Sequence, residues 1–349
     1  MLIESMEIYP VRMSLIDPIP MASGVIEHTR NVVVSLTSDD GLVGWGEGVE
    51  APALTHQDQA TIVSDLEALA PLVRGADPLQ RNRLWLRLRR ELPAATTAIG
   101  AIDIAVHDLA GKAMGVPVHQ LVGGAVRDRV PALTLVGSGD LAADADKLVR
   151  RRQEGYRWFK IKLGMAPPEV EVETLARAVE LAGEDGMVCG DVNEGWTEDE
   201  AGSFLSRLTG LGVRFVEQPV SRSDPEALLR LARRSPVPLC ADESAATLES
   251  VARLAGTGIG GVSLKLIKHG GITGVMRGAG VCSVGGLAVN LAGKVIESSI
   301  SAAANLHCAA AMDAVDYGCS PANQGVVQDL TEDPVRVRDG VFRVPHSPG

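Results

Sequence analysis

The chain has few aromatic residues and no excess of basic ones. Phe, Trp and Tyr make up 3% of the 349 residues, and 33 Lys and Arg stand against 44 Asp and Glu, for a formal net charge of −11. Such an acidic chain argues against nucleic acid or an anionic membrane as the main partner. No apolar run reaches the roughly 18 residues that a membrane-spanning helix needs. We therefore predict no nucleic-acid partner and no membrane partner.

Cysteine is also scarce, with five scattered residues and no Cys-x-x-Cys pair. An odd number of widely spaced cysteines does not make a complete disulfide set, and it lacks the ligand spacing of a zinc site. We interpret them as buried thiols in a reducing compartment. Because the first residues carry no recognisable secretory signal, we predict a cytoplasmic protein.

The first third of the chain has the pattern of strands followed by helices. Apolar extended residues on both sides of a turn signal predict a hairpin over residues 32–45. Helices are expected over 78–92, with Asp-Pro at the start, and over 94–114. These elements predict an α+β capping domain over residues 1–125, to which residues 325–349 are expected to return.

From about residue 130, short β-rich runs alternate with helical segments. Eight such runs recur at a spacing of about 25 residues, near 131–136, 158–162, 187–191, 213–217, 237–242, 261–266, 286–291 and 314–319. Buried strands separated by single helices predict a (β/α)7β-type TIM barrel over residues 126–324. A doubly wound α/β sheet is the alternative. The Gly-x-Gly-x-x-Gly at 256–261 does not favour it, since this triplet follows a helix and precedes a strand, the reverse of the dinucleotide fingerprint.

Lysine is rare, and four of the seven lysines fall in two apolar runs, 158–164 and 263–269. An ammonium, unlike a guanidinium, loses its proton near neutral pH when it is buried or crowded by cations, and we expect neighbouring cations to lower the pKa of a lysine base here. Between the two runs, three predicted strands end in Asp191, Glu217 and Asp242. Strand ends share one rim of a barrel, so these carboxylates suit a hard divalent cation. Lysines beside them predict removal of a proton α to a substrate carboxylate.

The chain resembles the mandelate racemase/muconate lactonizing enzyme family of the enolase superfamily, in its muconate lactonizing subgroup. The resemblance rests on an ordered set of motifs: Gly-Leu-Val-Gly-Trp-Gly-Glu (41–47), Ala-Ile-Asp-Ile-Ala-Val-His-Asp-Leu-Ala-Gly-Lys (101–112), Leu-Val-Gly-Gly (121–124), Lys-Ile-Lys (160–162), Asp-Val-Asn (191–193), Glu-Gln-Pro (217–219), Asp-Glu-Ser (242–244), Lys-x-x-Lys-x-Gly-Gly (265–271) and Ile-Glu-Ser (296–298). Lys-x-Lys on the second barrel strand excludes the racemase-type variant, which would need Lys-x-His.

The resemblance implies a role for the charged residues of the rim. The ligands of Mg²⁺, with Mn²⁺ as a substitute, would be Asp191, Glu217 and Asp242. The acid/base residues on opposite faces of the substrate would be Lys162 and Lys265, since enolase-superfamily sites use a Lys or His base with Mg²⁺. Auxiliary charges would come from Lys160 and, at the pocket edge, Glu297. Lys268 is left with an electrostatic or a structural role.

Further residues are candidate substrate contacts: Thr134, Asn193, Lys294, Met21, Ser23 and Glu50. Three of these, Met21, Ser23 and Glu50, lie in capping-domain loops that are expected to set the identity of the substrate. Lys294 stands where family members often carry a small residue. It either meets a second anionic group of the substrate or is solvated.

The expected activity is that of an isomerase or cycloisomerase acting on a small-molecule carboxylate through an enolate. Residues 133–140 resemble the first barrel strand of muconate cycloisomerases. A racemase or epimerase of an amino-acid derivative and a syn-dehydratase of a β-hydroxy acid remain open, and so does a retired barrel with a binding or structural role. The resemblance also implies a homo-oligomer, either a dimer or an octamer, and further residues after Gly349.

Overall fold

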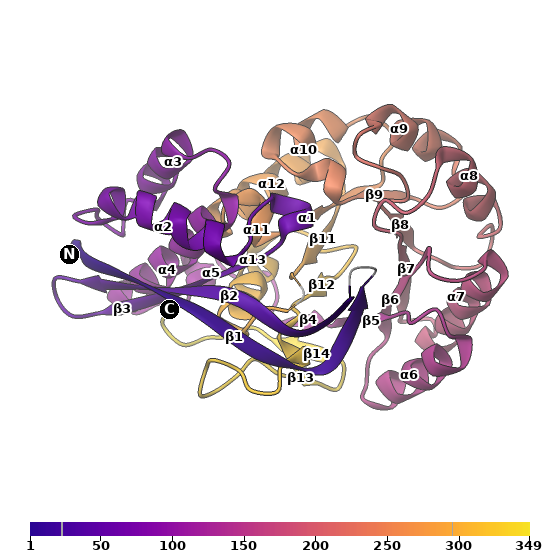
Figure 1. The fold of residues 1–349 in the computed structure, drawn as a ribbon, viewed down its shortest axis with the longest axis horizontal. Helices are drawn as coiled ribbons and strands as arrows, with labels where there is room; N and C mark the ends of the chain where they lie inside the picture. The colour runs from indigo at the N-terminus through magenta and orange to yellow at the C-terminus, as the bar shows by residue number, and fades with distance from the viewer. Residues whose placement is uncertain (22–23, 295) are drawn as a thin grey trace.

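The fold is built from two packed units, one around an antiparallel sheet and one around a parallel sheet (Figure 1). The structure is a computed structural model that describes residues 1–21, 24–294 and 296–349, without the side chains of 18–26. The first unit contains β1 (Ile3–Met21), β2 (Gly24–Ser38), β3 (Val43–Val49), α1 (Pro52–Thr55), α2 (Gln59–Val73), α3 (Arg81–Glu91), α4 (Thr96–Met114) and α5 (Val118–Leu121). Its strands lie in the order β1-β2-β3, and the predicted hairpin is present as β2–β3.

The antiparallel sheet packs closely on α4. Val34 of β2 and Ile102 of α4 belong to one buried apolar cluster. A Cβ at Gly46 would lie 1.9 Å from the backbone oxygen of Ala101, so only glycine allows this approach. The glycine-rich sequence of β3 therefore sets the distance between sheet and helix.

Helix α4 matches the helix predicted over 94–114, but α3 begins later than predicted. The prediction placed the first turn of α3 at Pro78 with Asp77 as its cap. In the structure Asp77 Oδ1 accepts a hydrogen bond from Leu79 N at 2.9 Å within a turn, and the helix begins at Arg81. The carboxylate that would cap the helix stabilises a local turn instead.

The second unit is an eight-stranded parallel sheet that curves into a nearly closed barrel (Figure 1). Its strands lie in chain order: β5 (Leu133–Val136), β6 (Trp158–Lys162), β7 (Met187–Asp191), β8 (Phe215–Glu217), β9 (Leu239–Ala241), β10 (Gly261–Leu264), β11 (Ala288–Ala292) and β12 (Cys319–Ser320). A parallel bridge between Ala132 and Cys319 joins the first strand to the last. The predicted TIM barrel is confirmed, and the doubly wound alternative is wrong because that sheet would keep two separate edges.

Helices cover the outside of the barrel: α6 (Leu141–Gln153), α7 (Pro168–Ala182), α8 (Glu198–Ser206), α9 (Pro225–Arg234), α10 (Leu248–Leu254), α12 (Ile272–Gly285) and α13 (Ser299–Ala311). The one-turn helix α11 (Leu266–His269) follows β10 and packs on α4, and two short 3-10 turns are η1 (Glu243–Ala245) and η2 (Asn323–Gly325). Thr197 and Glu200 form a capping box at α8, and Asp224 caps α9. Residues 256–261 lead from α10 into β10, as predicted. No helix in the part of the chain that the structure describes is both long enough and apolar enough to cross a bilayer.

Apolar side chains fill the barrel at the amino ends of its strands. They form one buried cluster: Leu133, Met187, Cys189, Phe215, Cys240 and Tyr317. The rings of Phe215 and Tyr317 stack with their centroids 4.1 Å apart, so two of the few aromatic residues serve here. The polar residues that close the strands lie at the opposite, carboxyl end of the barrel.

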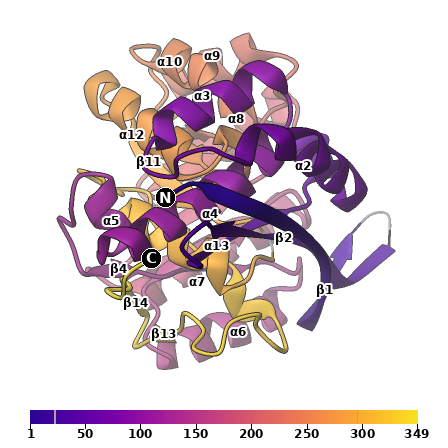
Figure 2. The ribbon, with the colours of Figure 1, turned by 90° about the vertical axis from the view of Figure 1, so that its left-hand side faces the viewer.

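The last segment leaves the barrel and pairs with the residues that lead into it. The strands of this antiparallel sheet are β13 (Val337–Arg338), β14 (Val341–Arg343) and β4 (Arg129–Pro131). Gly349 N donates to Val116 O at 3.2 Å, which brings the C-terminus to the end of α4 (Figure 2). The domain boundaries 1–125 and 126–324, with 325–349 assigned to the capping domain, stay predictions.

Candidate active site

Five charged residues meet at the carboxyl edge of the barrel sheet. Lys162, Asp191 and Glu217 are the last residues of β6, β7 and β8. Asp242 directly follows β9, and Lys265 directly follows β10. The strand register pairs Lys162 with Asp191 and Asp191 with Glu217, so these side chains lie on the same face of the sheet. Residues that are remote in sequence thus share one rim.

Lys160 and Lys162 contact the carboxylates that end β7 and β8. Lys160 Nζ lies 2.9 Å from Asp191 Oδ2 and 2.7 Å from Glu217 Oε2. Lys162 Nζ lies 2.7 Å from the same Asp191 oxygen and also donates to Asn193 Oδ1. The Lys162 side chain is 27% exposed and that of Lys160 is 11% exposed. Lys160 is therefore a buried bridge, and Lys162 is the lysine that reaches the open mouth.

Lys265 and Lys268 hold Asp242 from the other side. Lys265 Nζ lies 2.5 Å from Asp242 Oδ2, and Lys268 Nζ lies 2.7 Å from Asp242 Oδ1. Lys268 also donates to the backbone oxygens of Asp242 and Ser263, each at 2.7 Å. An ammonium has three donors, and all three of Lys268 are used by the protein. Of the two roles left open for Lys268, this geometry favours anchoring Asp242 and shaping its charge.

Two opposing effects set the pKa values of the rim residues. Burial favours the neutral form of each group, whereas the contacts between carboxylates and lysines favour the charged forms. Burial works against ionisation of Asp191, but Lys160 and Lys162 lower its pKa to about 2. The pKa of Glu217 is raised to about 7, because burial outweighs the attraction of Lys160. For Lys265, burial favours the neutral amine, yet the Asp242 carboxylate raises the pKa above its usual value. The nearest charge to Lys265 in this arrangement is the Asp242 carboxylate. Lowering of a lysine pKa by neighbouring cations, the bound metal ion among them, stays a prediction.

Asp191, Glu217 and Asp242 offer the oxygen ligands that a hard divalent cation prefers. In this structure, lysine ammonium groups contact all three carboxylates. Among the described residues, no three or more His, Cys, Asp or Glu side chains are grouped as metal ligands. Lys160 instead bridges two of the carboxylates. Glu217 Oε1 is nevertheless buried without any hydrogen-bond partner in the described chain. A buried carboxylate oxygen without a donor, in an all-oxygen set, is what a hard cation such as Mg²⁺ would satisfy.

Two buried residues of the rim were missed by the sequence analysis. Gln218 Oε1 accepts from Asp242 N at 3.1 Å and from Ser244 N at 3.0 Å, which holds the turn after β9. Glu243 accepts from Asn193 Nδ2 at 3.1 Å, and its Oε2 has no partner among the residues described. Gln218 lies in the Glu-Gln-Pro motif (217–219), and Glu243 lies in the Asp-Glu-Ser motif (242–244). Their position next to the predicted ligands Glu217 and Asp242 is the one feature of the sequence that could have marked them as site residues.

The register of β5 corrects one predicted substrate contact. Thr134 pairs with Phe159, and Phe159 belongs to the core between barrel and helices. Leu135 pairs with Lys160 and is 38% exposed. Because side chains alternate along a strand, Leu135 and not Thr134 lies on the face of the charged site. Both faces of a barrel strand are apolar, so its sequence does not mark the inner face.

The remaining predicted contacts fall into two groups. Lys294 follows β11, and burial together with the charges of Lys265 and Lys162 lowers its pKa to about 8, while Asp242 and Glu50 oppose this. Its ammonium and the Glu50 carboxylate therefore lie near the charged rim. Met21 and Ser23 are outside the described side chains, and Ser23 is outside the described residues altogether.

Glu297 is buried beside the rim and is held by protein donors. It accepts from Ala322 N at 3.1 Å and from Asn305 Nδ2 at 3.2 Å. Burial and the nearby Glu47 carboxylate raise the pKa of Glu297 to about 8. Such a carboxyl group stays protonated near neutral pH, so a role as a negative charge at the pocket edge is not favoured.

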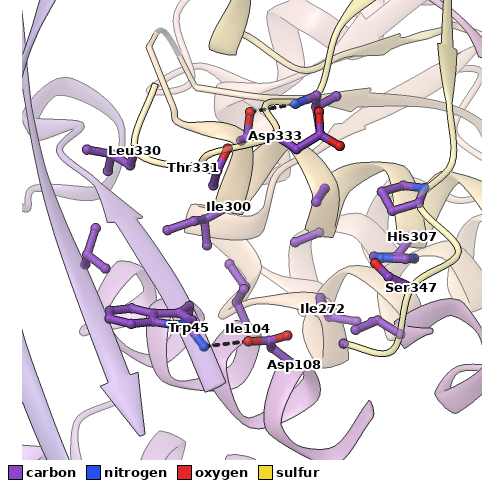
Figure 3. A pocket seen from close by; sticks show the side chains of 18 of the residues that line it. Trp45, Ile104, Asp108, Ile272, Ile300, His307, Leu330, Thr331, Asp333 and Ser347 are labelled. Carbon is purple, nitrogen blue, oxygen red and sulfur yellow. Dashed lines mark hydrogen bonds between the residues drawn. The ribbon is translucent and has the colours of Figure 1, made fainter. Parts of the chain in front are cut away.

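A cavity of about 750 Å³ lies elsewhere in the molecule (Figure 3). It is bounded by the antiparallel sheet, α4, α13 and the C-terminal segment, with Trp45, Ile300 and His307 among its lining residues. Asp108 points into this space and accepts from Trp45 N at 2.7 Å. None of the lysines or carboxylates of the barrel rim lines it, so it is not the candidate active site.

Fold and site together define a class of protein: a TIM-barrel enzyme with an α+β cap, whose rim carries carboxylates between lysines. Residues 3–123 match the N-terminal domain of the mandelate racemase/muconate lactonizing enzymes. Residues 140–349 match the family described as enolase C-terminal domain-like. The chain belongs to the mandelate racemase/muconate lactonizing enzyme family of the enolase superfamily.

Relatives of known name are similar over nearly the whole chain. A chloromuconate cycloisomerase from Pseudomonas putida is 32% identical, with 100% of this chain and 95% of the relative covered. A crystal structure of muconate lactonizing enzyme from Pseudomonas fluorescens, complexed with muconolactone, is 28% identical and superposes with a TM-score of 0.93, covering 100% of this chain and 95% of that one. An N-succinyl-L-Arg/Lys racemase from Bacillus cereus is 28% identical, covering 88% and 84%. The predicted isomerase of the muconate lactonizing type is confirmed.

Proposed function

We propose that this chain is a Mg²⁺-dependent cycloisomerase that closes an unsaturated dicarboxylate of the muconate class to a lactone. The observation that carries the proposal is the placement of Lys162 and Lys265 at opposite ends of one arc of carboxylates. Cycloisomerases among the similar proteins support the choice of reaction. Lys294 near the same rim supports a substrate with a second anionic group.

The chemistry needs a proton donor at one carbon. One carboxylate oxygen adds to the double bond conjugated with the other carboxylate, and the electron pair moves to the α-carbon and its carboxylate as an enolate. A C–O bond forms, the carbon–carbon π bond breaks, and a proton must reach the α-carbon. Lys162 is the proposed donor, because its ammonium is the most open of the lysines around the carboxylates and is oriented by Asn193. Lys265 stays cationic on the opposite side.

The remaining rim residues prepare the site for negative charge. Mg²⁺ held by Asp191, Glu217 and Asp242 would supply Lewis-acid stabilisation of the substrate carboxylate. Lys160 keeps the buried pair Asp191 and Glu217 from repelling each other. Lys268 fixes Asp242 through three hydrogen bonds. These groups are placed before substrate arrives, which is the condition for strong electrostatic stabilisation.

A racemase is the second candidate. Lysines on both sides of a bound α-carbon suit removal of a proton from one face and its return to the other, and one similar protein is an N-succinyl amino-acid racemase. The number of lysines that the reaction requires separates the two candidates. A racemase needs both lysines to exchange a proton, whereas a cycloisomerase needs one proton donor.

The direct test is turnover of cis,cis-muconate and chlorinated muconates in the presence of Mg²⁺. The loss of the conjugated-diene absorbance measures the rate. We expect lactone formation that disappears with a chelator and returns with Mg²⁺ or Mn²⁺. N-succinyl amino acids in D₂O serve as the competing substrates. If the N-succinyl amino acids exchange their α-proton and no muconate is turned over, the chain is a racemase and the cycloisomerase proposal is wrong.

The homo-oligomer and the cytoplasmic location stay predictions.

The pH dependence of substrate binding should identify Lys294 as an anion-binding group. With its pKa lowered to about 8, this lysine is cationic at pH 7 and loses its charge as the pH rises through 8. The KM of a dicarboxylate should therefore rise above pH 8, while Lys294→Met should raise KM about tenfold at pH 7 and flatten its rise. Lys147→Met, on the outer helix α6, is the matched control. An unchanged KM in Lys294→Met would mean that this lysine is solvated and does not meet the substrate.

A further inference from the structure

Arg222, in the loop after β8, links the barrel to the capping unit. Its Nε donates to Glu194 Oε1 at 2.9 Å, and its Nη2 donates to Glu194 Oε2 at 2.6 Å. The backbone N of Arg222 donates to the same carboxylate at 2.6 Å. The same Nη2 also donates to the backbone oxygen of Ala53, in α1, at 3.2 Å. One guanidinium thus joins two barrel loops and a capping helix.

The turn that carries Glu194 also carries Asn193, which contacts the candidate proton donor Lys162. Glu194 has a φ of 67° and Asn193 a φ of 46°, conformations that non-glycine residues rarely adopt. Glu194 N donates to Gln218 O at 2.8 Å, which fixes this turn on the loop after β8. Asn193 accepts from Lys162. The direction of the lysine therefore depends on the turn that Arg222 holds.

Burial works against the charge of Glu194, but the hydrogen bonds from Arg222 outweigh it and lower its pKa. The Arg222 side chain is 33% exposed and that of Glu194 is 20% exposed. The two side chains therefore form a charged, bidentate ion pair that is partly shielded from water. The planar guanidinium of an arginine holds a carboxylate in one orientation, which the single ammonium of a lysine would not do.

The capping segment at the other end of this link lies over the barrel mouth. Val49 and Ala51 are buried against Ile267 of α11, which lies between Lys265 and Lys268. Leu54 of α1 packs against this apolar cluster and is partly buried, whereas Ala53 is exposed on the outer side of the turn. Its one contact with Arg222 ties the outer turn of the segment to the loops of β7 and β8.

We propose that Arg222 is a positioning residue that latches residues 51–56 of the capping unit onto the barrel mouth and, through Glu194 and Asn193, sets the direction of Lys162. Closure of the mouth over the substrate and orientation of the proton donor are thereby coupled. The inference rests on the proposed function for its kinetic part only. The mechanical part concerns the fold and is measured without substrate.

The mechanical test is amide hydrogen exchange of residues 51–57 in three variants. Arg222→Met removes the latch, Arg222→Lys keeps the charge without the bidentate geometry, and Glu194→Gln keeps the shape without the charge. We expect exchange in this segment to quicken at least about tenfold in Arg222→Met and less in the other two. The matched control is Arg230→Met, which breaks another bidentate arginine–glutamate pair, with Glu198, on the outer helices. Wild-type exchange in folded Arg222→Met would overturn the latch.

The kinetic test separates positioning from general loss of structure. In Arg222→Met we expect KM to rise about tenfold and kcat to fall about tenfold, with partial rescue in Arg222→Lys and no change in Arg230→Met. A melting temperature within the range of the Arg230→Met variant excludes unfolding as the cause. Unchanged KM and kcat alongside faster exchange would overturn the coupling to Lys162. If the wild type turns over no muconate, the proposed function fails, while the exchange experiment still decides the latch.

Discussion

Replacing Lys162 by alanine should reduce cycloisomerase turnover by at least about a thousandfold. The residue ends β6, lies 2.7 Å from Asp191 and is the most exposed lysine around the carboxylates, so it is the amine positioned to deliver a proton to a substrate in the mouth. The fold should tolerate the change, because Asp191 keeps Lys160 at 2.9 Å as its counter-ion. Steady-state rates, with circular dichroism to check folding, measure the loss.

The companion variant Lys265→Ala decides between the two candidate reactions. A cycloisomerase needs one proton donor, so Lys265→Ala should keep measurably more turnover than Lys162→Ala, with its loss arising from the charge removed beside Asp242. A racemase would lose racemisation equally in both variants. Lys112→Met, which breaks a contact with Asp108 in the capping unit, should leave the rate unchanged and controls for lysine removal in general. Full activity in Lys162→Ala would overturn its assignment as the donor.

The barrel and its rim could be predicted because each strand, together with the charged residue that ends it, is encoded in one short stretch of sequence. Strand-length apolar runs separated by single helices specify parallel strands, and a charged residue at the end of each run must appear at the carboxyl edge. This logic located Asp191, Glu217 and Asp242 without any knowledge of their distances. The short eighth strand, Cys319–Ser320, was placed too early, because the run over 314–319 ends in a turn before pairing begins.

What the sequence did not reveal depends on contacts between distant segments. Leu135 faces the site instead of Thr134 because of a register with β6 that two apolar faces do not disclose. Gln218 and Arg222 act through carbonyl and amide partners on other loops, which no local pattern encodes. The raised pKa of Lys265 depends on a carboxylate 23 residues earlier in the chain. Sequence motifs therefore named the charged groups, and the structure determined which of them neutralise one another.

Glu217→Gln should abolish turnover, by at least about a thousandfold, and weaken divalent-cation binding by about a hundredfold. Glu217 is fully buried, its Oε2 receives Lys160 and Asn290, and its Oε1 lacks a donor in the described chain. An amide of the same shape keeps the packing but offers a neutral oxygen where a cation prefers a carboxylate. Electron paramagnetic resonance of bound Mn²⁺ measures the affinity independently of the reaction.

Glu243→Gln is the control that makes this result specific, because Glu243 is also buried and also has an oxygen without a partner in the described part of the chain. It directly follows Asp242, yet its other oxygen accepts from Asn193, which directs it toward the loop after β7. We expect Glu243→Gln to bind Mn²⁺ within a few fold of the wild type. If Glu243→Gln lost the cation and Glu217→Gln kept it, the ligand set would have to move from the strand ends to the turns that follow them. A general loss of buried charge predicts equal damage in both variants, whereas a cation held by Asp191, Glu217 and Asp242 predicts damage in Glu217→Gln alone.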